Sequence, residues 1–474
     1  MAAVAKTLSD PSLIREKAYI NGKWVAARSG ETFSVTNPAT GEVLGSAPEC
    51  GVDDLDDAIA AASAAFKRVR VLRRLYDLLV ENRADVSRIV TAENGKARAD
   101  ADGEALFAAS VFEWFAEEAP RIHGDVAPHA SPGCRIQILR QPVGVCGLIT
   151  PWNFPIAMAS RKVAAALAAG CAVVLKSDGV TPFAANALAV LAERAGLPPG
   201  VFNVVTALAN TPALGLALCR SDSVKKISFT GSTRPGAGGN APFIVFDDAD
   251  LETAVAAAVV AKFKVTGQTC VCANRIYVQE GVYERFSARL VEEVKKFRIG
   301  NGADTSAGAD AVTHGPLTIG VEKTEEHVRD AVAKGATVLL GGRRASALGP
   351  KFFELTVLGG VTDDMAVMRE ETFGPLAALS PFKTEAEVIR RANTSDVGLE
   401  SYVMTNDLNR QYRVSESLEY GMVAVNTGVI SDPASPFGGV KHSGFGREGS
   451  KYGLDEYLVL KSIVTGGVHT DYKL

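Results

Sequence analysis

The sequence has few of the residues that bind metals or build disulfide frameworks. Its six His are scattered along 474 residues, and none of its seven Cys stands at a Cys/His spacing typical of a metal site. The number of Cys is odd, and several lie in apolar runs such as "VGVCGLIT", which is typical of buried thiols in a reducing compartment. We therefore expect no metal and no disulfide framework.

Long apolar runs and a strong charge of either sign are also missing. No apolar run reaches the length of a membrane span, and a net charge of −4 gives no reason to expect nucleic acid or an anionic membrane as partner. Residues 1–25 lack the apolar core of a secretory signal and carry acids that transit peptides avoid. The expected location is the cytoplasm, with a weak mitochondrial signal left open.

What is present is an alternation of strand and helix patterns. Strand-like and helical segments alternate over residues 135–230, and a second alternating region starts near residue 243. This order predicts a doubly wound parallel sheet and a second α/β unit, with a cleft between them and ligands at the carboxyl ends of strands. Further patterns predict a hairpin over 19–25 and helical segments over 53–67, 70–91 and 103–119.

Several loops at the predicted strand ends carry chemically useful side chains. The Asn153 amide in "ITPWNFP" suits a developing oxyanion, Lys176 in "LKSDG" suits a ribose or phosphate, and the turn at 231–233 presents N–H groups to a phosphate. Cys270 in "GQTC" is a nucleophile only if a base or a lowered pKa activates it. Taken singly, each has an ordinary structural explanation: a buried Cys, a capping Asn, a solvated Lys, a helix cap.

In combination these motifs resemble the NAD(P)-dependent aldehyde dehydrogenase superfamily from about residue 15 to the end. The residues that carry the resemblance keep the family's order and approximate spacing: Trp152-Asn153, Lys176, Gly231-Ser232-Thr233, Cys270, Glu371 in "ETFGP", and "PFGG" at 436–439. Within the superfamily, "GQTCVCANR", "EYGMVAVNTGVIS" and "GREGSKYGLDEYL" are most similar to succinate-semialdehyde dehydrogenases.

The resemblance implies an aldehyde-dehydrogenase-like α/β fold in three parts. A doubly wound cofactor-binding domain is expected at 1–122 and 143–237, an α/β catalytic domain at 238–442, and a small β oligomerisation element at 123–142 and 453–470. The implied reaction is oxidation of an aldehyde, succinate semialdehyde above all, to the carboxylate with NAD or NADP. A homodimer or homotetramer is expected by the same resemblance.

The resemblance also implies a role for each site residue. Cys270 attacks the aldehyde carbon to give a thiohemiacetal, Asn153 and the Cys270 N–H hold the oxyanion, and water later hydrolyses a thioester. The other implied site residues are Lys162 and Glu448 for a proton relay; Thr150, Trp152, Lys176, Gly231, Ser232, Glu371 and Phe373 for the cofactor; and Arg161, Arg275 and Ser431 for a distal substrate carboxylate. A purely structural role for Arg161 and Arg275 stays open.

One segment departs from the family pattern. In the family, the GST turn starts a helix, and the strand after it ends in Glu-Leu-Gly-Gly, whose Glu is the general base for thioester hydrolysis. Here only Ala237 separates "GSTRPG" from "GGNAP". One helix and one strand, about 17 residues at typical element lengths, therefore have no counterpart. Gly236 or a gap takes the place of the Glu.

Two functions follow from this departure. One is an active aldehyde dehydrogenase; the alternative is a catalytically impaired or inactive relative, arising even from a mis-spliced gene, that acts as a binding or oligomer-partner subunit. Gly179 stands where many NAD-preferring relatives carry Glu, which leaves NAD versus NADP open.

Overall fold

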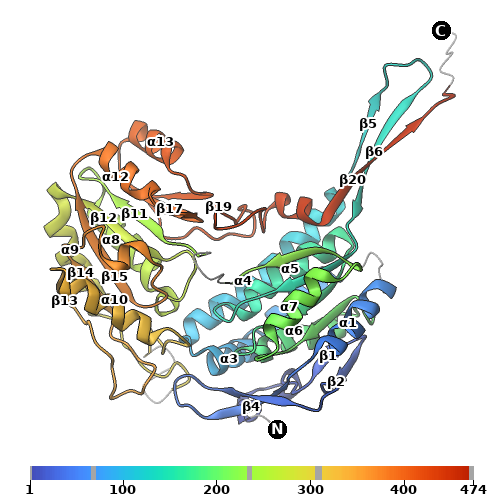
Figure 1. Cartoon of the computed structure of the whole chain (residues 1–474), viewed down its shortest axis with the longest axis horizontal. Coiled ribbons are helices and arrows are strands. Elements are labelled where there is room, and N and C mark those ends of the chain that lie inside the picture. Colours follow the sequence, from blue (N-terminus) through green and yellow to red (C-terminus); the bar gives the residue numbers. More distant parts are fainter. Residues whose placement is uncertain (1–2, 66–70, 232–237, 305–311, 469–474) are drawn as a thin grey trace.

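Two α/β lobes and a projecting β arm form the part of the chain that the structure, a computed structural model, describes (Figure 1). The described residues are 3–65, 71–231, 238–304 and 312–468. Between the lobes, the polypeptide passes from residue 231 to residue 238 through a stretch outside the described residues.

The first lobe is built on a six-stranded sheet with the order β10-β7-β8-β9-β1-β2. Its parallel strands are β7 (Val145–Ile149), β8 (Ala172–Lys176), β9 (Phe202–Val205) and β10 (Val224–Phe229). The crossover helices are α5 (Pro155–Ala169), α6 (Pro182–Arg194) and α7 (Thr211–Arg220). The antiparallel hairpin of β1 (Ala18–Ile20) and β2 (Lys23–Val25) completes the sheet. The predicted doubly wound sheet and the hairpin at 19–25 are confirmed.

The direction of winding in this sheet reverses at β7. The chain moves from β7 to β8 and β9 on one side, and then returns to place β10 on the other side of β7. In doubly wound sheets, ligands bind at this switch point, outside the carboxyl ends of the strands. Two predicted site segments lie there, because 150–154 follows β7 directly and Gly231 follows β10.

Helices from the N-terminal third cover the first sheet. They are α1 (Val52–Ala64), α2 (Leu72–Glu81), α3 (Arg83–Asn94) and α4 (Arg98–Glu118). The helical pattern predicted over 70–91 is therefore divided, because Asn82 leaves helical geometry and its side-chain amide donates to the carbonyl of Leu78 at 2.8 Å. A separate ribbon of β3 (Thr32–Thr36) and β4 (Val43–Pro48) lies near the N-terminus (Figure 1).

The second lobe contains a seven-stranded sheet with the order β13-β14-β15-β12-β11-β17-β18. All neighbouring pairs are parallel except β13 with β14. The strands are β11 (Ala241–Val245), β12 (Ala273–Gln279), β13 (Thr337–Leu340), β14 (Thr356–Gly359), β15 (Leu376–Phe382), β17 (Glu400–Met404) and β18 (Met422–Val425). The helices are α8 (Leu251–Phe263), α9 (Glu280–Val294), α10 (Val321–Ala333), α11 (Ala366–Arg369), α12 (Glu385–Asn393) and α13 (Leu408–Ser417). A short pair, β16 (Val397–Gly398) and β19 (Val440–Lys441), lies beside them.

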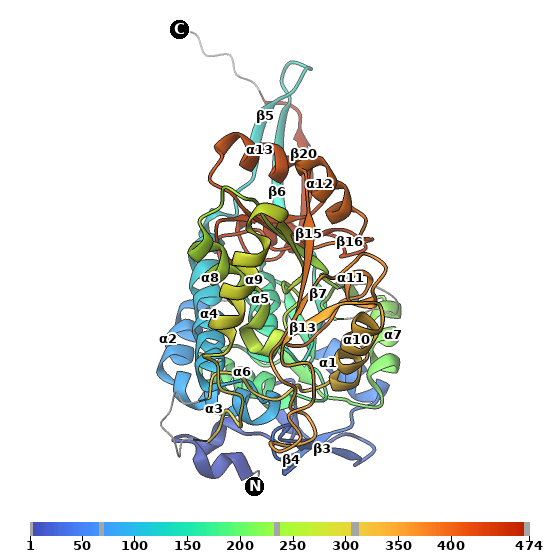
Figure 2. The same ribbon diagram turned by 90° about the vertical axis from the view of Figure 1, so that its left-hand side faces the viewer.

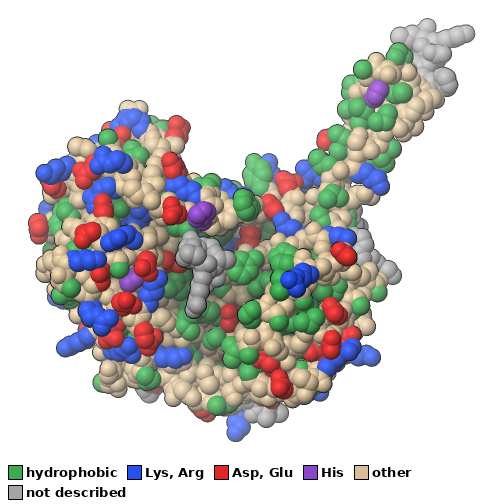
Figure 3. Space-filling model, in the orientation of Figure 1, with side chains coloured by type: hydrophobic (Ala, Val, Ile, Leu, Met, Phe, Trp, Pro, Cys, Tyr) green, Lys and Arg blue, Asp and Glu red, His purple; other side chains and the backbone are tan. Residues whose placement is uncertain are grey.

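The arm is a three-stranded antiparallel sheet that projects from the first lobe (Figures 1 and 2). Its strands are β5 (Asp125–Pro128), β6 (Arg135–Pro142) and β20 (Leu458–Thr465), in the order β20-β6-β5. Apolar side chains lie on its surface (Figure 3), among them Val126 at 68% and Leu460 at 70% exposure. A strand edge with exposed apolar residues is a surface that natural proteins normally cover.

The predicted loss of a helix and a strand concerns the edge of the first sheet. β10 is an edge strand there, and Phe229 at its end is 49% exposed. From Phe229 to Ala241, the described residues form no helix or strand, and β11 already belongs to the second sheet. Since 232–237 lie outside the described residues, the missing elements and the three domain boundaries stay predictions.

Two absences hold for the described residues. None of the helices there combines the length and the apolar character that crossing a bilayer requires. No group of three or more His, Cys, Asp or Glu side chains within the described ranges is arranged to hold a metal ion.

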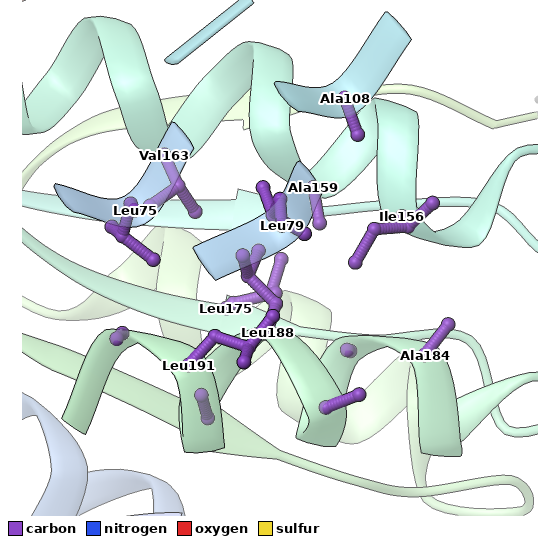
Figure 4. Packing of buried hydrophobic residues seen from close by; sticks show 14 of the residues in the cluster. Leu75, Leu79, Ala108, Ile156, Ala159, Val163, Leu175, Ala184, Leu188 and Leu191 are labelled. Carbon is purple, nitrogen blue, oxygen red and sulfur yellow. The ribbon is translucent and has the colours of Figure 1, made fainter. Parts of the chain in front are cut away.

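The core of the first lobe lies between its sheet and its helices (Figure 4). Leu79 of α2 packs in this cluster with Ala159 of α5, Leu175 of β8 and Leu188 of α6, and all four side chains are fully buried. Because apolar residues from three layers meet here, this cluster ties α2 and α5 to the sheet that carries the site loops.

Replacing Leu79 with Ala should lower the free energy of unfolding by about 2–5 kcal/mol, since it leaves a cavity in a close-packed core. Val80→Ala, at the exposed neighbouring position, is the control and should change stability by less than about 0.5 kcal/mol. Urea denaturation of both variants measures the difference. Equal effects would show that this cluster does not hold the lobe together.

Candidate active site

A cavity between the two lobes contains Cys270. It measures about 850 Å³ when the solvent at its mouth is counted. Residues from both lobes line it, among them Phe107, Phe154, Arg161, Lys264, Cys270, Tyr402, Ser431 and Phe437. Three residues predicted from separate parts of the sequence, Cys270, Arg161 and Ser431, are thus brought to one cavity.

The loop before Cys270 has an unusual backbone. Val265 and Thr266 both have left-handed φ values, 53° and 56°, and Gly267 continues at 74°. Such values cost energy for β-branched residues and persist only where the surroundings hold them. The Val265 N–H donates to Asp100 Oδ2 at 3.0 Å, and Thr266 Oγ1 donates to the carbonyl of Gly315 at 3.1 Å.

Gln268 and Tyr402 fix the rest of this loop. The Gln268 side-chain amide donates to the carbonyls of Val265 and Pro316, and its oxygen accepts the N–H of Thr318 at 2.8 Å. The Tyr402 hydroxyl, from β17, donates to the carbonyl of Val271 at 2.7 Å. Cys270 is therefore held on both sides, which keeps its sulfur at the cavity.

Asn153 contacts the Cys270 loop directly. Its Nδ2 donates to the carbonyl of Gln268 at 3.1 Å, two residues before Cys270. An amide group has two hydrogens, so one remains for another acceptor. The predicted pairing of Asn153 with the Cys270 segment thus has a geometric basis, while its oxyanion role stays a prediction.

A buried ion pair positions Asn153. Lys96 Nζ lies 2.6 Å from Glu104 Oε2 and donates to the carbonyl of Asn153 at 2.7 Å. The other oxygen of Glu104 accepts the N–H groups of Ile156 and Ala157 at 3.0 and 3.1 Å, in the first turn of α5. A carboxylate is favoured there because the first N–H groups of a helix lack partners within it. The sequence analysis missed both Lys96 and Glu104.

The electrostatic surroundings of Cys270 oppose its ionisation. Burial raises the pKa of the Cys270 thiol well above its usual range, and the carboxylates of Glu400 and Glu371 add to the rise. Arg161 acts in the opposite direction. The sulfur is therefore a thiol at rest and needs a proton acceptor when it attacks.

Arg161 is a buried cation without an anionic partner. It lies on α5 with its guanidinium 3.9 Å from the ring centre of Phe437 and 5.1 Å from that of Phe107. No ion pair or hydrogen bond joins the guanidinium to another described residue. Burial accordingly lowers its pKa, against the opposing charges of Glu448 and Cys270. A buried guanidinium in a cavity calls for an anion from outside the chain.

Arg275, predicted beside Arg161, does not line this cavity. It lies in β12, fully buried, where its Nε donates to the carbonyl of Asn240 at 2.9 Å and its NH2 to Ala392 and Tyr420. Its donors are thus used within the second lobe. The substrate-binding role expected for Arg275 is corrected to a structural one.

Lys264 takes the place expected for a second cation. It follows α8, lines the cavity, and is exposed. Lys264 was not predicted from the sequence, where both expected carboxylate-binding cations were Arg; its position six residues before Cys270 was the available signal.

Lys162 and Glu448, the predicted relay, form an ion pair. Lys162 is fully buried and also donates to Ser228 Oγ at 3.0 Å. Burial alone would raise the pKa of Glu448, but Lys162 and Arg161 hold it below its usual value. Glu448 is therefore ionised at neutral pH, and the proton-transfer role of the pair stays a prediction.

The predicted cofactor residues gather at the switch point and beside it. Trp152 and Phe373 pack edge to face with ring centres 5.7 Å apart. Thr150 is bonded through its N–H to the carbonyl of Lys176, whose Nζ donates to the carbonyl of Ala207 at 3.0 Å and to Thr211 Oγ1 at 2.6 Å. Gly231 follows β10, and Ser232 lies outside the described residues.

Glu371 supplies a test of whether this region fits a dinucleotide. Its Oε1 is buried and has no hydrogen-bond partner among the described residues, so it is an available acceptor for a ribose hydroxyl. Burial raises the pKa of Glu371 to about 8, against the opposing effects of Lys323, Lys262 and the Gly239 N–H. This part of the site therefore fits a dinucleotide.

Gly179 is not next to open space. A Cβ there would lie 2.7 Å from the carbonyl oxygen of Ala207 and 2.8 Å from Leu208 Cα. The small residue at 179 is thus required by the close approach of the 207–208 backbone, and it carries no information on NAD versus NADP.

Comparison with known proteins gives one consistent family. The profile described as "Aldehyde dehydrogenase family" matches residues 24–463. Succinate-semialdehyde dehydrogenase [NADP(+)] of Saccharomyces cerevisiae is 49% identical over 490 residues, covering 98% of this chain and 97% of the relative. Glutarate-semialdehyde dehydrogenase of Pseudomonas aeruginosa is 50% identical, covering 97% and 100%.

Solved structures agree. A crystal structure described as an E. coli NADP dependent enzyme superposes with a TM-score of 0.94 at 49% identity, covering 97% of this chain and all of that one.

The yeast comparison runs over 490 positions, more than the 474 residues of the chain, so the relative includes positions without a counterpart here. This agrees with a lost segment but does not locate it.

Replacing Lys96 with Met should lower the free energy of unfolding by about 3–5 kcal/mol, because Glu104 then keeps an uncompensated buried charge. Replacing both Lys96 with Met and Glu104 with Leu should cost less than the sum of the single changes. The exposed pair Arg73–Glu113 is the control, and Arg73→Met should cost about 0–1 kcal/mol. Additive effects in a double-mutant cycle would exclude the coupling.

Glu371 should make folding weaker as pH rises. Its pKa is about 8 in the folded chain against a usual value of 4.5, so between these pH values the folded state binds the extra proton. Stability should therefore fall by up to about 1.4 kcal/mol per pH unit from this group alone. Glu371→Gln should remove that part of the decline in urea titrations, whereas Glu370→Gln, at its exposed neighbour, should not.

Proposed function

The chain belongs to the aldehyde dehydrogenase family, and from this premise we propose that it oxidises a short aldehyde with a distal carboxylate to the dicarboxylate. Succinate semialdehyde is the expected substrate, and NAD(P)+ the oxidant. The observation that carries the proposal is the unpaired guanidinium of Arg161 in the cavity of Cys270.

The cavity orients such a substrate from both ends. A carboxylate at Arg161 can accept two parallel N–H donors from the guanidinium that lies over the rings of Phe107 and Phe437, and Lys264 and Ser431 line the same cavity. An aldehyde four or five carbons long then has its carbonyl end free to approach Cys270. The two relatives above are named for aldehydes of this kind, which supports the assignment.

The chain's own residues supply the covalent chemistry. Cys270 Sγ forms a bond to the carbonyl carbon as its S–H proton passes to solvent water, and the C=O electron pair moves to the oxygen. Protonation of that oxygen from water completes the thiohemiacetal. The oxygen of this adduct gains charge, and the second hydrogen of the Asn153 amide and the N–H of Cys270 are available to it. Since Lys96 and Gln268 fix Asn153 beforehand, no reorganisation is needed at that moment.

Lys176, Glu371, Trp152 and Phe373 would hold the dinucleotide. When bound, its nicotinamide supplies the hydride acceptor that oxidation of the adduct requires. NADP is favoured over NAD because the yeast relative and the E. coli structure are both named for NADP. The alternative of an impaired partner subunit finds no support in the comparisons.

Assembly and location are further parts of the proposal. The arm of β5, β6 and β20 ends in a free strand edge on each side and carries exposed apolar side chains, which supports a homodimer or homotetramer joined through it. The cytoplasm remains the expected location, and nucleic acids and membranes are not expected as partners.

Replacing Arg161 with Met should reduce kcat/KM for succinate semialdehyde by about 30-fold or more, since a buried cation loses its carboxylate. The value for butanal, which has the same chain length without the carboxylate, should change little. Formation of NADPH or NADH at saturating cofactor measures both rates. Stability should not fall, because Arg161 has no ion-pair partner among the described residues.

Two comparisons complete this experiment. Cys270→Ala should abolish turnover of both aldehydes, and Lys264→Met should reduce the rate with succinate semialdehyde less than Arg161→Met, because Lys264 is exposed. Equal losses for the two aldehydes in Arg161→Met would contradict the carboxylate site.

A further inference from the structure

Glu400 is a buried acid that the mechanism above does not use. It begins β17, is fully buried, and neither of its carboxylate oxygens has a hydrogen-bond partner among the described residues. An unpaired buried carboxyl group costs several kcal/mol in an apolar interior. The hydrogen bonds of the described residues therefore do not explain why this carboxyl group is buried here.

Glu400 lies beside the backbone of Cys270. A Cβ built at Gly239 would overlap the carbonyl oxygen of Cys270 and would lie 3.6 Å from Glu400 Oε1. Gly239 thus lies against both the Cys270 carbonyl and the Glu400 carboxylate, and only a glycine fits this close approach.

The strand register gives the same placement. Side chains two apart on a strand share a face, so Glu400 lies on the side of β17 that also carries Tyr402. Tyr402 lines the cavity and bonds to Val271 beside Cys270. Glu400 is also among the acidic groups that raise the pKa of the Cys270 thiol.

The proposed function leaves one step without a base. The family's general-base Glu would precede the Gly-Gly pair that corresponds to Gly238-Gly239, and this chain has Gly236 or a gap at that position. Glu448 is already held by Lys162, and the pKa of its carboxyl is lowered, which makes it a weak proton acceptor. Glu371 is assigned to the cofactor.

We propose that Glu400 is the base that activates water for hydrolysis of the Cys270 thioester. The proposal rests on the proposed function, because it needs Cys270 to be acylated. Glu400 of β17 would thus serve as the general base, the role that the family assigns to the Glu after the GST turn.

The step balances without any further reactant. A water molecule beside Glu400 attacks the thioester carbon; the new C–O bond forms as an O–H bond of the water breaks and its proton passes to Glu400. The C–S bond then breaks, and its electron pair leaves with Cys270 Sγ. The proton on Glu400 passes to the sulfur, which restores the thiol and the carboxylate, and the product is the carboxylic acid.

Burial and the neighbouring carboxylate of Glu371 raise the pKa of Glu400 well above its usual range, so it is a strong base once ionised. The titratable groups that face it are Glu371, Cys270, Cys272, Tyr402 and Tyr420. Among these groups, the Glu371 carboxylate disfavours the ionised form of Glu400, because it is a second negative charge close by. Hydrolysis should therefore accelerate as pH rises from neutral into the alkaline range.

The test separates acylation from hydrolysis and needs no cofactor. The full-length protein is mixed with p-nitrophenyl acetate, which acylates a reactive Cys directly. Release of p-nitrophenol should show a burst equal to the enzyme concentration, followed by continuing turnover limited by hydrolysis. Glu400→Gln should keep the burst but lose about 10²–10⁴-fold in the later phase, the usual effect of removing a general base.

Three further readouts fix the interpretation. The acetyl-enzyme should accumulate in Glu400→Gln, as seen by intact-mass spectrometry, and the rise of the later phase with pH should disappear. Ser401→Ala is the matched control: it is also buried in β17, its hydroxyl donates to the carbonyl of Met422 at 3.5 Å, and both phases should remain as in the unmodified protein.

Other results would overturn the proposal. An unchanged later phase in Glu400→Gln, a parallel loss of burst and turnover, or a burst without any turnover in the unmodified protein would each show that Glu400 is not the base. No burst in any variant, together with no oxidation of succinate semialdehyde, would instead reject the proposed function itself, because Cys270 would then not be a nucleophile.

Discussion

The buried ion pair of Lys96 and Glu104 is the constraint on which the site depends. It joins α3 and α4 to the start of α5, because Glu104 accepts the first N–H groups of that helix and Lys96 holds the carbonyl of Asn153. Arg161 and Lys162 lie further along the same helix, so their positions follow from its N-terminus. A buried ion pair whose polar atoms are all hydrogen-bonded is compatible with a stable fold, whereas one of the two charges alone would destabilise it.

A second constraint comes from the opposite lobe. Asp100 of α4 and the Gln268 side chain help to hold the left-handed residues before Cys270 by binding the surrounding backbone. The Asn153 amide then joins the two systems through the Gln268 carbonyl. Hydrogen bonds between the two lobes thus fix the walls of the cavity around Cys270.

The sequence predicted the parts of this design that depend on local pattern. Alternating strand and helix segments gave the doubly wound sheet, and the order of the motifs brought Cys270, Arg161 and Ser431 together correctly. It did not predict that Arg275 donates to backbone carbonyls within the second lobe. The sequence pattern of an Arg in a strand is the same whether the side chain binds carbonyls or a substrate. Lys96 and Glu104 were missed for a similar reason: a Lys and a Glu near helix ends are normally solvated, and only packing of α4 against α5 buries them.

A shortened segment after β10 is compatible with this cavity for a physical reason. The chain is fixed again from Gly238 onward, since Ser443 Oγ donates to the Gly238 carbonyl at 3.1 Å and Arg275 Nε donates to that of Asn240 at 2.9 Å. Side chains at 238 or 239 would overlap Glu371 and the Cys270 carbonyl, so this stretch has one possible path. A shortening upstream of Gly238 would therefore leave this end of the segment fixed beside Glu371 and Cys270.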